Sequence, residues 1–508
     1  MQKKYVLGLD IGTTSAKAVI FSIDGKVVAE VERGFPTMHP RPGRSEQDPE
    51  NIRVQTETAV KAVINSSGIA ADELHAMGLS TAMHSLICCD GEGFALSPLL
   101  TWADGRSSEI ADEWKKDGTD KIYLETGTPL HPMSPILKLA WMKRVQYEPY
   151  VNASYFFSMK EYLLWHWSGE SVVDYSVASS NGFFNIFSLD WHEDALRLAG
   201  ISRDKLSRPV PPEYQLNSID KAAAERMGIS PSLPIVIGGS DGPLANLGIG
   251  AIQPGASALT VGTSGAIRQM TTEPVTDDKK EIFCYAVDKN LWVMGGPTNN
   301  GAVVLQWLKE LFQHEHDEVN AASLDLEALT KEAAAIRPGA EGLLFLPYLN
   351  GERAPYWDAD ARGSYVGLSM IHKRPHLVRA GMEGVIFNLY QIFNTVNRLG
   401  GESQQVYASG GFARSSLWLQ MLADIFGKDI HVPLSHQSSA WGAAWYALKS
   451  VGAVSSLEAI ADSVPMKEVI CTNMQAHEEY EAYYETFREL YAVMHPHFKK
   501  LAKAARNQ

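Results

Sequence analysis

Hydrophobic and polar residues follow two different periods along this 508-residue chain. Near the N-terminus, apolar runs at 5–9 and 18–23 flank a polar Gly-Thr-Thr segment, and 27–31 alternates after an Asp-Gly pair. This pattern predicts a β-hairpin over 5–31. Elsewhere apolar residues recur at helical spacing. Helices are predicted at 50–67, 136–145, 159–167, 220–227, 301–313, 325–335, 375–398, 415–426 and 439–450. Strands and helices are therefore mixed throughout the chain.

The strongest pattern is an internal repeat. Residues 9–17 (LDIGTTSAK) align with residues 259–267 (LTVGTSGAI), 250 positions later, which is about half the chain. Each copy consists of an apolar strand, a Gly-Thr-Thr/Ser turn and a second strand. The repeat predicts two related domains with a cleft between them.

The boundary between the two halves is expected near residue 245, after a buried type of strand. The predicted domains are 1–245 and 246–470, followed by a C-terminal helix over 471–508. This last segment carries aromatic and apolar residues along one helical stripe, which is typical of core packing. Pro496 should break or kink the helix.

The repeated turn has the chemistry of a phosphate site. Glycine permits a backbone geometry in which N–H groups face a ligand, and the hydroxyl groups add donors. The residues concerned are Gly12, Thr13 and Thr14 in the first copy and Gly262 and Thr263 in the second. For one copy alone a simple β-turn is the better explanation, but two copies half a chain apart favour a pair of turns that hold a polyphosphate.

Only the first copy carries an acidic residue in the strand before the turn. Asp10 stands where the second copy has Thr260. A single carboxylate suits one Mg²⁺ ion that bridges phosphates, often through water. We therefore predict that Asp10 is the metal-binding residue.

The segment 238–242 (GGSDG) allows two interpretations. As G-x-S-x-G it resembles the nucleophile elbow of hydrolases, with Ser240 as the nucleophile. The other interpretation uses Asp241, which follows a buried strand where α/β proteins bind ligands. Asp241 also suits a helix N-terminus, since Pro243 follows it.

A Gly-Gly pair, Gly410 and Gly411, separates a predicted strand from a predicted helix. Two glycines at this place let the backbone approach an anionic group at a helix N-terminus. A plain tight turn is the alternative.

Composition narrows the classes of function. The chain has 45 Lys and Arg against 59 Asp and Glu, a formal charge of −14, which argues against partners that are nucleic acids or anionic membranes. No apolar run approaches the ~18 residues of a membrane span. Four cysteines without a C-x-x-C pair indicate a reduced compartment and no structural zinc, so we expect a cytoplasmic protein. P-loop and protein-kinase motifs are absent.

Several blocks of sequence, in order, resemble the FGGY carbohydrate kinases of the actin/hexokinase-like superfamily, essentially from end to end. Besides the two Gly-Thr turns, the matching blocks are 158–165 (SMKEYLLW), 174–179 (DYSVAS), 349–355 (LNGERAP) and 408–414 (ASGGFAR). The blocks 82–85 (AMHS), 101–107 (TWADGRS) and 126–133 (TGTPLHPM) are most similar to the gluconate-kinase branch, and the first two are also similar to xylulose kinases. The resemblance implies an α/β fold of two actin/hexokinase-like (ribonuclease H-like) domains with a nucleotide cleft between them.

The resemblance also implies roles for individual residues. Asp241 matches the catalytic base, and Ser415 replaces a residue near the adenine that is often Asn. The implied substrate contacts are Met83, His84, Trp102, Asp104 and Asp241, the implied ATP contacts are Gly12, Thr13, Thr14, Lys17, Gly262, Thr263, Gly410 and Gly411, and the implied metal ligand is Asp10.

The implied reaction is ATP-dependent phosphorylation of D-gluconate, with Mg²⁺ as cofactor. Xylulose or another pentulose or polyol is the alternative substrate, and a non-catalytic ATP-binding regulator is the alternative from a different class. The carboxylate of gluconate should meet a cation, for which the sequence offers His84, Arg106, His131 and Lys138. Arg106 could equally form a surface ion pair, and Lys138 could lie on a solvated helix face. The oligomeric state, a homodimer included, stays open.

Overall fold

The computed structural model describes residues 3–313, 325–434 and 437–506. The chain forms two compact units, each built from segments that are distant in sequence. The first unit consists of Met1–Pro254, Met270–Met294 and Gln437–Pro465, and the second of Gly255–Gln269, Gly295–His436 and Met466–Gln508. These units differ from the predicted division, because 246–254, 270–294 and 437–465 belong to the first unit and the predicted C-terminal helix over 471–508 belongs to the second.

The first unit is built on a five-stranded sheet with the strand order β13-β5-β1-β2-β3. Its strands are β1 (Tyr5–Ile11), β2 (Ser15–Ser22), β3 (Val27–Gly34), β5 (Leu74–Thr81) and β13 (Ile235–Ser240). The segment predicted as a hairpin forms three antiparallel strands, β1, β2 and β3, whereas β5 and β13 run parallel to β1.

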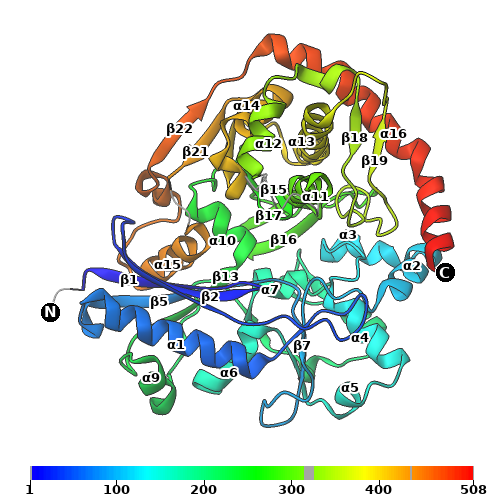
Figure 1. The fold of residues 1–508 in the computed structure, drawn as a ribbon. Coiled ribbons are helices and arrows are strands. Elements are labelled where there is room, and N and C mark those ends of the chain that lie inside the picture. The colour runs from blue at the N-terminus through cyan, green and yellow to red at the C-terminus, as the bar shows by residue number, and fades with distance from the viewer. Residues whose placement is uncertain (1–2, 314–324, 435–436, 507–508) are drawn as a thin grey trace. The chain divides into compact units, whose positions relative to one another are not determined.

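Helices pack on both faces of this sheet (Figure 1). Helix α1 (Pro49–Ser67) packs on β2 and β3, and α15 (Ser438–Ser450) packs on β1 and β5. The approach of α15 is close: a Cβ atom added at Gly8 or Gly78 would lie 2.1 or 2.0 Å from a carbonyl oxygen of that helix. Two glycines in the sheet therefore allow α15, from the second half of the chain, to pack within the first unit.

The second sheet has the strand order β16-β17-β15-β14-β20-β21-β22. Its strands are β14 (Ala256–Val261), β15 (Gly265–Thr271), β16 (Phe283–Asp288), β17 (Leu291–Thr298), β20 (Gln405–Ser409), β21 (Ile430–Pro433) and β22 (Met466–Ile470). Strand β15 is antiparallel to β14, whereas β20 and β21 run parallel to it. The order β17-β15-β14-β20-β21 repeats the order β3-β2-β1-β5-β13, which confirms the predicted internal repeat.

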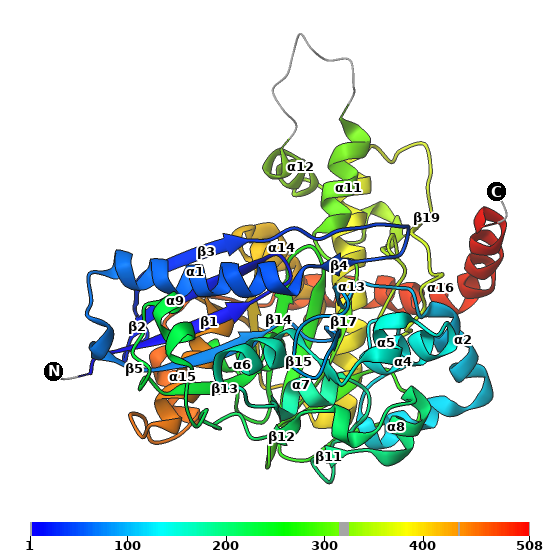
Figure 2. The ribbon, with the colours of Figure 1, turned by 90° about the horizontal axis from the view of Figure 1, so that it is seen from below.

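The second unit is organised around a long central helix, α13, which packs against its neighbours α11, α12, α14 and α16 (Figure 2). The bounds of these helices are α11 (Val303–Phe312), α12 (Leu326–Ala333), α13 (Arg374–Gly400), α14 (Ser416–Phe426) and α16 (Met474–Arg506). Helix α16 continues through Pro496, so this proline does not end it.

The remaining elements are short and connect these layers. In the first unit they are β4 (Glu46–Gln47), β6 (Ile87–Cys89), β7 (Leu99–Leu100), β8 (Tyr155–Phe157), β9 (Val172–Asp174), β10 (Phe184–Asn185), β11 (Asp190–Trp191), β12 (Arg208–Val210), α2 (Ser108–Asp117), α3 (Tyr123–Thr126), α4 (Pro135–Arg144), α5 (Glu148–Asn152), α6 (Met159–Ser168), α7 (Tyr175–Ser180), α8 (Glu193–Ala199), α9 (Lys221–Met227) and α10 (Asp241–Gly248). The second unit adds β18 (Leu344–Leu346) and β19 (Ser364–Val366). No helix in the described residues is both long and apolar enough to cross a membrane.

Candidate active site

A row of polar side chains crosses the first sheet beside the Gly-Thr turn. Asp10 of β1 lies opposite Lys17 of β2 and opposite Ser80 of β5. Residues paired in this way point to the same face of a sheet. The Ser80 hydroxyl donates a 2.7 Å hydrogen bond to Asp10 Oδ1, and Lys17 Nζ lies 3.8 Å from a carboxylate oxygen of Glu32. The structure thus brings together the predicted metal ligand, Asp10, and the predicted phosphate contact, Lys17.

The surroundings of the Asp10 carboxylate disfavour its ionised form. Burial raises its pKa to about 6, and the neighbouring charge of Asp241 adds to the rise. The Ser80 hydrogen bond and the charge of Lys17 lower the pKa of Asp10, but they do not cancel the rise. A bound cation would stabilise the ionised form of Asp10. Carboxylates that are buried close to one another in this way are typical of functional sites.

Asp241 is the first residue of α10 and follows β13 directly. Its side chain remains partly exposed, and the dipole of the helix favours negative charge at this end. The Ser439 hydroxyl donates a 3.3 Å hydrogen bond to the backbone carbonyl of Asp241. The preceding Ser240 is fully buried. The hydrolase interpretation needs an exposed serine nucleophile and is therefore wrong.

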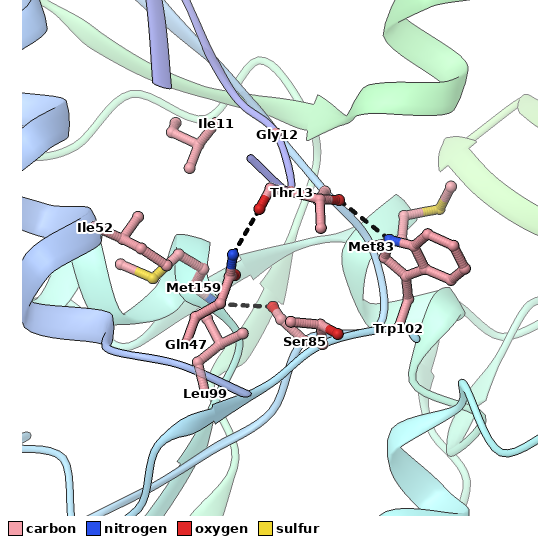
Figure 3. A pocket seen from close by; sticks show the side chains of 12 residues that line it. Ile11, Gly12, Thr13, Gln47, Ile52, Met83, Ser85, Leu99, Trp102 and Met159 are labelled. Carbon is pink, nitrogen blue, oxygen red and sulfur yellow. Dashed lines mark hydrogen bonds between the residues drawn. The ribbon is translucent and has the colours of Figure 1, made fainter. Parts of the chain in front are cut away.

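Figure 3 shows the first turn next to two of the predicted substrate loops. The Trp102 indole N–H donates a 3.1 Å hydrogen bond to the Thr13 hydroxyl, and the Gln47 side-chain amide donates a 2.6 Å hydrogen bond to the Thr13 carbonyl. Met83 and Trp102 line a small cavity beside the turn. The cavity measures about 20 Å³, which holds a water molecule but no sugar acid. A substrate site here must therefore include the surface around this cavity.

The buried ammonium group of Lys138, on α4, connects three predicted substrate loops. Lys138 Nζ donates hydrogen bonds to the carbonyls of Thr101, Met133 and His84, at 2.7, 2.8 and 2.9 Å. Burial lowers the pKa of Lys138 to about 7, although three carbonyl acceptors are the surroundings that a protonated ammonium prefers. The expectation of a solvated helix face at Lys138 is wrong, because its side chain is fully buried. Since all three N–H donors of its ammonium are used in this way, Lys138 links the three loops by hydrogen bonds.

Asp104 and Arg106 form a second buried link. Asp104 accepts hydrogen bonds from the Ser45 backbone N–H at 2.9 Å and from Arg106 Nε at 2.6 Å. Arg106 also pairs with Glu46 at 2.5 Å, and its side chain is 2% exposed. Arg106 is thus an ion-pair residue, as one of the two sequence interpretations expected, but it is buried. Asp104 is fully buried, so a direct contact between Asp104 and a sugar would require this link to open.

Two histidines remain as candidates for binding the substrate carboxylate. His84 adopts a left-handed backbone conformation, with φ of 64°, that is uncommon outside glycine. His84 Nδ1 donates a 2.7 Å hydrogen bond to the Ser180 carbonyl. His131 Nδ1 instead accepts a 3.2 Å hydrogen bond from the Met133 backbone N–H. The ring proton of neutral His131 therefore sits on Nε2, which makes this nitrogen a donor.

In the second unit, three of the four predicted ATP-binding residues lie in one groove of about 820 Å³. Gly262, Thr263 and Gly411 line the groove together with apolar side chains of α11 and α12. Gly410 has a φ of 104°, and a Cβ atom there would lie 2.4 Å from the Val261 carbonyl oxygen, so this position requires glycine. Polar backbone at one end and apolar walls along the side suit a nucleotide.

The second turn is held from behind by the start of α11. The backbone N–H of Ala302 donates a 2.8 Å hydrogen bond to the Gly262 carbonyl, and those of Gly301 and Val303 donate to the Thr263 carbonyl. Because the turn carbonyls are occupied in this way, the rest of the turn backbone can face the groove.

Behind this helix start lies Glu352, a fully buried carboxylate. It accepts five hydrogen bonds, from the Thr298 hydroxyl, the side-chain amides of Asn300 and Asn388, and the backbone N–H groups of Asn299 and Arg353. Burial raises the pKa of Glu352, whereas these donors lower it. An acceptor with five donors fixes the segment that leads into Gly301 and the second turn.

The first unit suits a cation that arrives with phosphates. Among residues 3–313, 325–434 and 437–506, no group of three or more His, Cys, Asp or Glu side chains could hold a metal ion. Mg²⁺ is commonly bound through one or two carboxylates plus phosphate oxygens and water. Asp10, with a raised pKa and a neighbouring carboxylate, fits that kind of site.

Comparison with known sequences identifies both halves of the chain. The profile of the FGGY family of carbohydrate kinases, N-terminal domain, matches residues 5–248, and the profile of the C-terminal domain matches residues 257–451. The chain belongs to the FGGY family of carbohydrate kinases. The two-domain, actin/hexokinase-like fold predicted for this FGGY kinase is confirmed.

The similar proteins fall into two groups by name, gluconate kinases and xylulose kinases. The gluconokinase of Bacillus subtilis (strain 168) is 43% identical over 469 residues, which cover 91% of this FGGY kinase and 90% of that protein. The crystal structure of gluconate kinase from Lactobacillus acidophilus is 32% identical with a TM-score of 0.92, over 98% of this chain and 99% of that one. A ligand-bound xylulose kinase from the same organism is also 32% identical with a TM-score of 0.93, over 98% of this chain and 100% of that one. The backbone fold is therefore equally similar to both kinds of kinase.

Sequence reasoning missed the buried groups that hold the loops of this FGGY kinase in place. The structural roles of Lys138 and Glu352 could not be found from the sequence, since each depends on hydrogen bonds between distant segments. The available signal was chemical: each is a charged residue, and a buried charged residue needs partners. Gln47, which holds the first turn, carried no signal at all.

Proposed function

We propose that this FGGY kinase transfers the γ-phosphoryl group of ATP to the terminal hydroxyl of D-gluconate, giving 6-phosphogluconate. The observation that carries the reaction is the acid pair Asp10 and Asp241 at the carboxyl edge of the first sheet. The choice of gluconate rests on the 43% identity to a gluconokinase. The residue roles that follow belong to the same proposal, as does a cytoplasmic location.

Each role follows from the position of a side chain. Asp241 accepts the proton of the attacking hydroxyl, since the helix N-terminus favours its ionised form. Asp10, oriented by Ser80, holds Mg²⁺, which when bound neutralises charge on the phosphates. Lys17 places a second positive charge next to Asp10. Because phosphoryl transfer has a loose transition state, positioning and electrostatics should contribute more than proton abstraction.

In the second unit, the backbone around Gly262, Thr263 and Gly411 binds the nucleotide. Backbone N–H groups in a glycine-rich turn form a concave site for phosphate oxygens. The apolar side of the groove, which includes Leu305 and Ala334, offers a surface for the base. Ser415 is engaged as the N-cap of α14, where it accepts a hydrogen bond from the Trp418 backbone, so we assign it no contact with the adenine.

The carboxylate of gluconate is assigned to His84 and His131. Lys138 is excluded because its ammonium is fully buried and donates to three backbone carbonyls. Arg106 is excluded because its side chain is 2% exposed and is paired with Asp104 and Glu46. His131 carries its proton on Nε2 when it is neutral, as its Nδ1 accepts a hydrogen bond, so this nitrogen is of the donor type that a carboxylate needs.

The proposal is tested by measuring ADP release with D-gluconate, with D-xylulose and without acceptor, at equal concentrations and with Mg²⁺. We expect kcat/KM for gluconate to exceed that for xylulose by about 10²-fold or more, because a site built to pair a polar group rejects analogues that lack it. ³¹P NMR of the product should show a phosphomonoester on the terminal carbon. A preference for xylulose would favour the xylulose-kinase alternative, and ATP binding without ADP release for any sugar would favour the non-catalytic regulator.

A further inference from the structure

The strand that delivers Asp241 is irregular just before it ends. The pairing of β13 with β5 shifts between Val236 and Gly239, which marks a β-bulge. Gly238 lies in the bulge with a φ of 62°, and a Cβ atom there would lie 2.0 Å from the Leu79 carbonyl oxygen. A bulge interrupts the ladder of hydrogen bonds, so the backbone groups on either side of it need other partners.

The buried side chain of Lys160, on α6, supplies two of these partners. Lys160 Nζ donates hydrogen bonds to the carbonyls of Ile237 at 3.0 Å and Gly239 at 2.7 Å, on either side of Gly238. It donates a third to Asp174 Oδ2 at 2.7 Å. The side chains of Lys160 and Asp174 are 0% and 1% exposed. All three donors of the ammonium are thus used, and two of them hold the bulge.

Asp174 extends the connection to the residue that precedes Asp241. Asp174 Oδ1 accepts a 2.6 Å hydrogen bond from the Ser176 hydroxyl. The Ser176 oxygen in turn accepts a 2.7 Å hydrogen bond from the Ser240 backbone N–H. The carbonyls at 237 and 239 and the N–H at 240 are therefore held by one network of buried side chains.

We propose that Lys160 is a positioning residue for Asp241, acting through the bulge and through Asp174 and Ser176. The network fixes the backbone from Ile237 to Ser240, and Asp241 is the next residue, so the direction of its carboxylate depends on these contacts. The ammonium of Lys160 also interacts electrostatically with the Asp241 carboxylate. This inference rests on the proposed function, in which Asp241 receives the proton of the substrate.

If the proposal holds, substitution of Lys160 or Ser176 should lower the turnover rate without weakening substrate binding. A displacement of a reacting group by about 1 Å slows catalysis by about 10²-fold. We therefore expect Lys160→Met to lower kcat by about 10²-fold and Ser176→Ala by about 10-fold, with KM for gluconate and for ATP changed little. Ser176→Ala is the milder variant, since it leaves the Lys160–Asp174 pair intact.

The decisive test combines each substitution with Asp241→Asn in a double-mutant cycle. If Lys160 and Ser176 act through Asp241, their substitution should not slow the Asp241→Asn protein further, because residues that act as a unit give non-additive effects. Thr56→Val serves as the matched control: Thr56 is fully buried in α1 and its hydroxyl donates to the Ile52 carbonyl of its own helix. This control should lose a buried hydrogen bond without losing turnover.

Two results would overturn the inference. One is a loss of kcat in the Asp241→Asn background equal to that in the wild-type background, in folded variants. The other is a loss that appears in KM alone. If Lys160→Met does not fold, Ser176→Ala decides by the same criteria. A wild-type protein without turnover on any sugar would instead contradict the proposed function, and with it the inference.

Discussion

The two copies of the repeat share a backbone plan and differ in the charge that they carry. In the first unit Asp10 of β1 accepts a 2.7 Å hydrogen bond from Ser80 of the parallel strand β5. In the second unit the corresponding residue of β14 is Thr260, which is hydrogen bonded at 3.1 Å to Ser409 of the parallel strand β20. In both copies the serine lies directly opposite in the register. One arrangement of side chains thus holds a carboxylate in one unit and a hydroxyl in the other.

The strand on the other side of each pair differs as well. Lys17 lies opposite Asp10, whereas Ala266 lies opposite Thr260. A carboxylate next to a phosphate group is repelled unless a cation lies between them, whereas a neutral turn can bind phosphate with backbone N–H groups alone. In the proposed function, the duplicated scaffold therefore binds polyphosphate in both units, and the need for a metal ion is confined to the first.

Changing the polar group at each of the two equivalent positions should break this comparison most strongly. Asp10→Asn keeps the shape of the side chain and removes its charge. We expect it to lower kcat/KM by about 10²- to 10³-fold, because a bound cation contributes several kcal/mol to phosphoryl transfer. Thr260→Val, the matched change in the second unit, removes one neutral hydrogen bond of about 1 kcal/mol and should lower kcat/KM less than 10-fold. Equal losses in a coupled ADP-release assay would contradict the asymmetry.

A weaker change at the same two places should sharpen the comparison. Ser80→Ala removes the donor that orients Asp10. Residues that hydrogen bond to a metal ligand commonly contribute about 10- to 100-fold to metal affinity. We therefore expect the Mg²⁺ concentration needed for half-maximal rate to rise in Ser80→Ala. Ser409→Ala, its counterpart, should leave this Mg²⁺ requirement unchanged. A shift of the same size in both variants would show that the second unit also holds the metal.

The smallest expected effect concerns the stability of the metal-free protein. The pKa of Asp10 is raised from 3.8 to about 6 in the folded state, so the folded protein binds more protons than the unfolded chain between these values. Asp10 therefore costs stability fully above pH 6, and this cost disappears as the pH falls toward 4. The shift sets an upper limit of about 3 kcal/mol, and partial solvent exposure of the residue reduces it to about 1–2 kcal/mol.

Asp10→Asn should consequently unfold at higher denaturant concentration than the wild type at pH 8 with EDTA. The gain should shrink progressively between pH 6 and pH 4, and adding Mg²⁺ with ATP should stabilise the wild type more than the variant. Denaturation followed by circular dichroism at several pH values measures this. A gain in stability of the same size at pH 5 and pH 8, or no gain at either pH, would show that the ionised Asp10 does not destabilise the folded protein.

Much of the fold could be predicted because periodic patterns report local structure. Helices α1, α4, α6 and α13 lie within two residues of the ranges predicted from apolar spacing. The repeat predicted two related halves, since both copies end a strand with the same turn, and the two sheets share a strand order. The position of α15 could not be predicted, because its packing in the first unit depends on backbone contact at Gly8 and Gly78. Such contacts between distant segments leave no periodic signal.

The candidate site could be predicted only in part, for a related reason. Gly262, Thr263 and Gly411 were expected together and line one groove, and Asp10 and Lys17 were expected near phosphates and are paired across two strands. The loops that should bind the sugar are harder to predict from the sequence, because their shape depends on the hydrogen bonds and ion pairs of buried residues such as Lys138 and Arg106. Residue type alone does not show whether a lysine faces solvent or three carbonyls. The similarity of short sequence segments therefore indicates where the substrate loops lie, and the structure shows which buried residues hold these loops in place.

The most direct test of this account is the turnover of Asp241→Asn with D-gluconate and saturating MgATP. We expect kcat to fall by about 10²- to 10⁴-fold, the contribution typical of an acid–base group, while the affinity for ATP measured by calorimetry stays within about twofold of the wild type. Turnover close to that of the wild type would contradict the assignment of Asp241 as the base. It would also contradict the proposal that the first unit carries the catalytic base while the second binds the nucleotide.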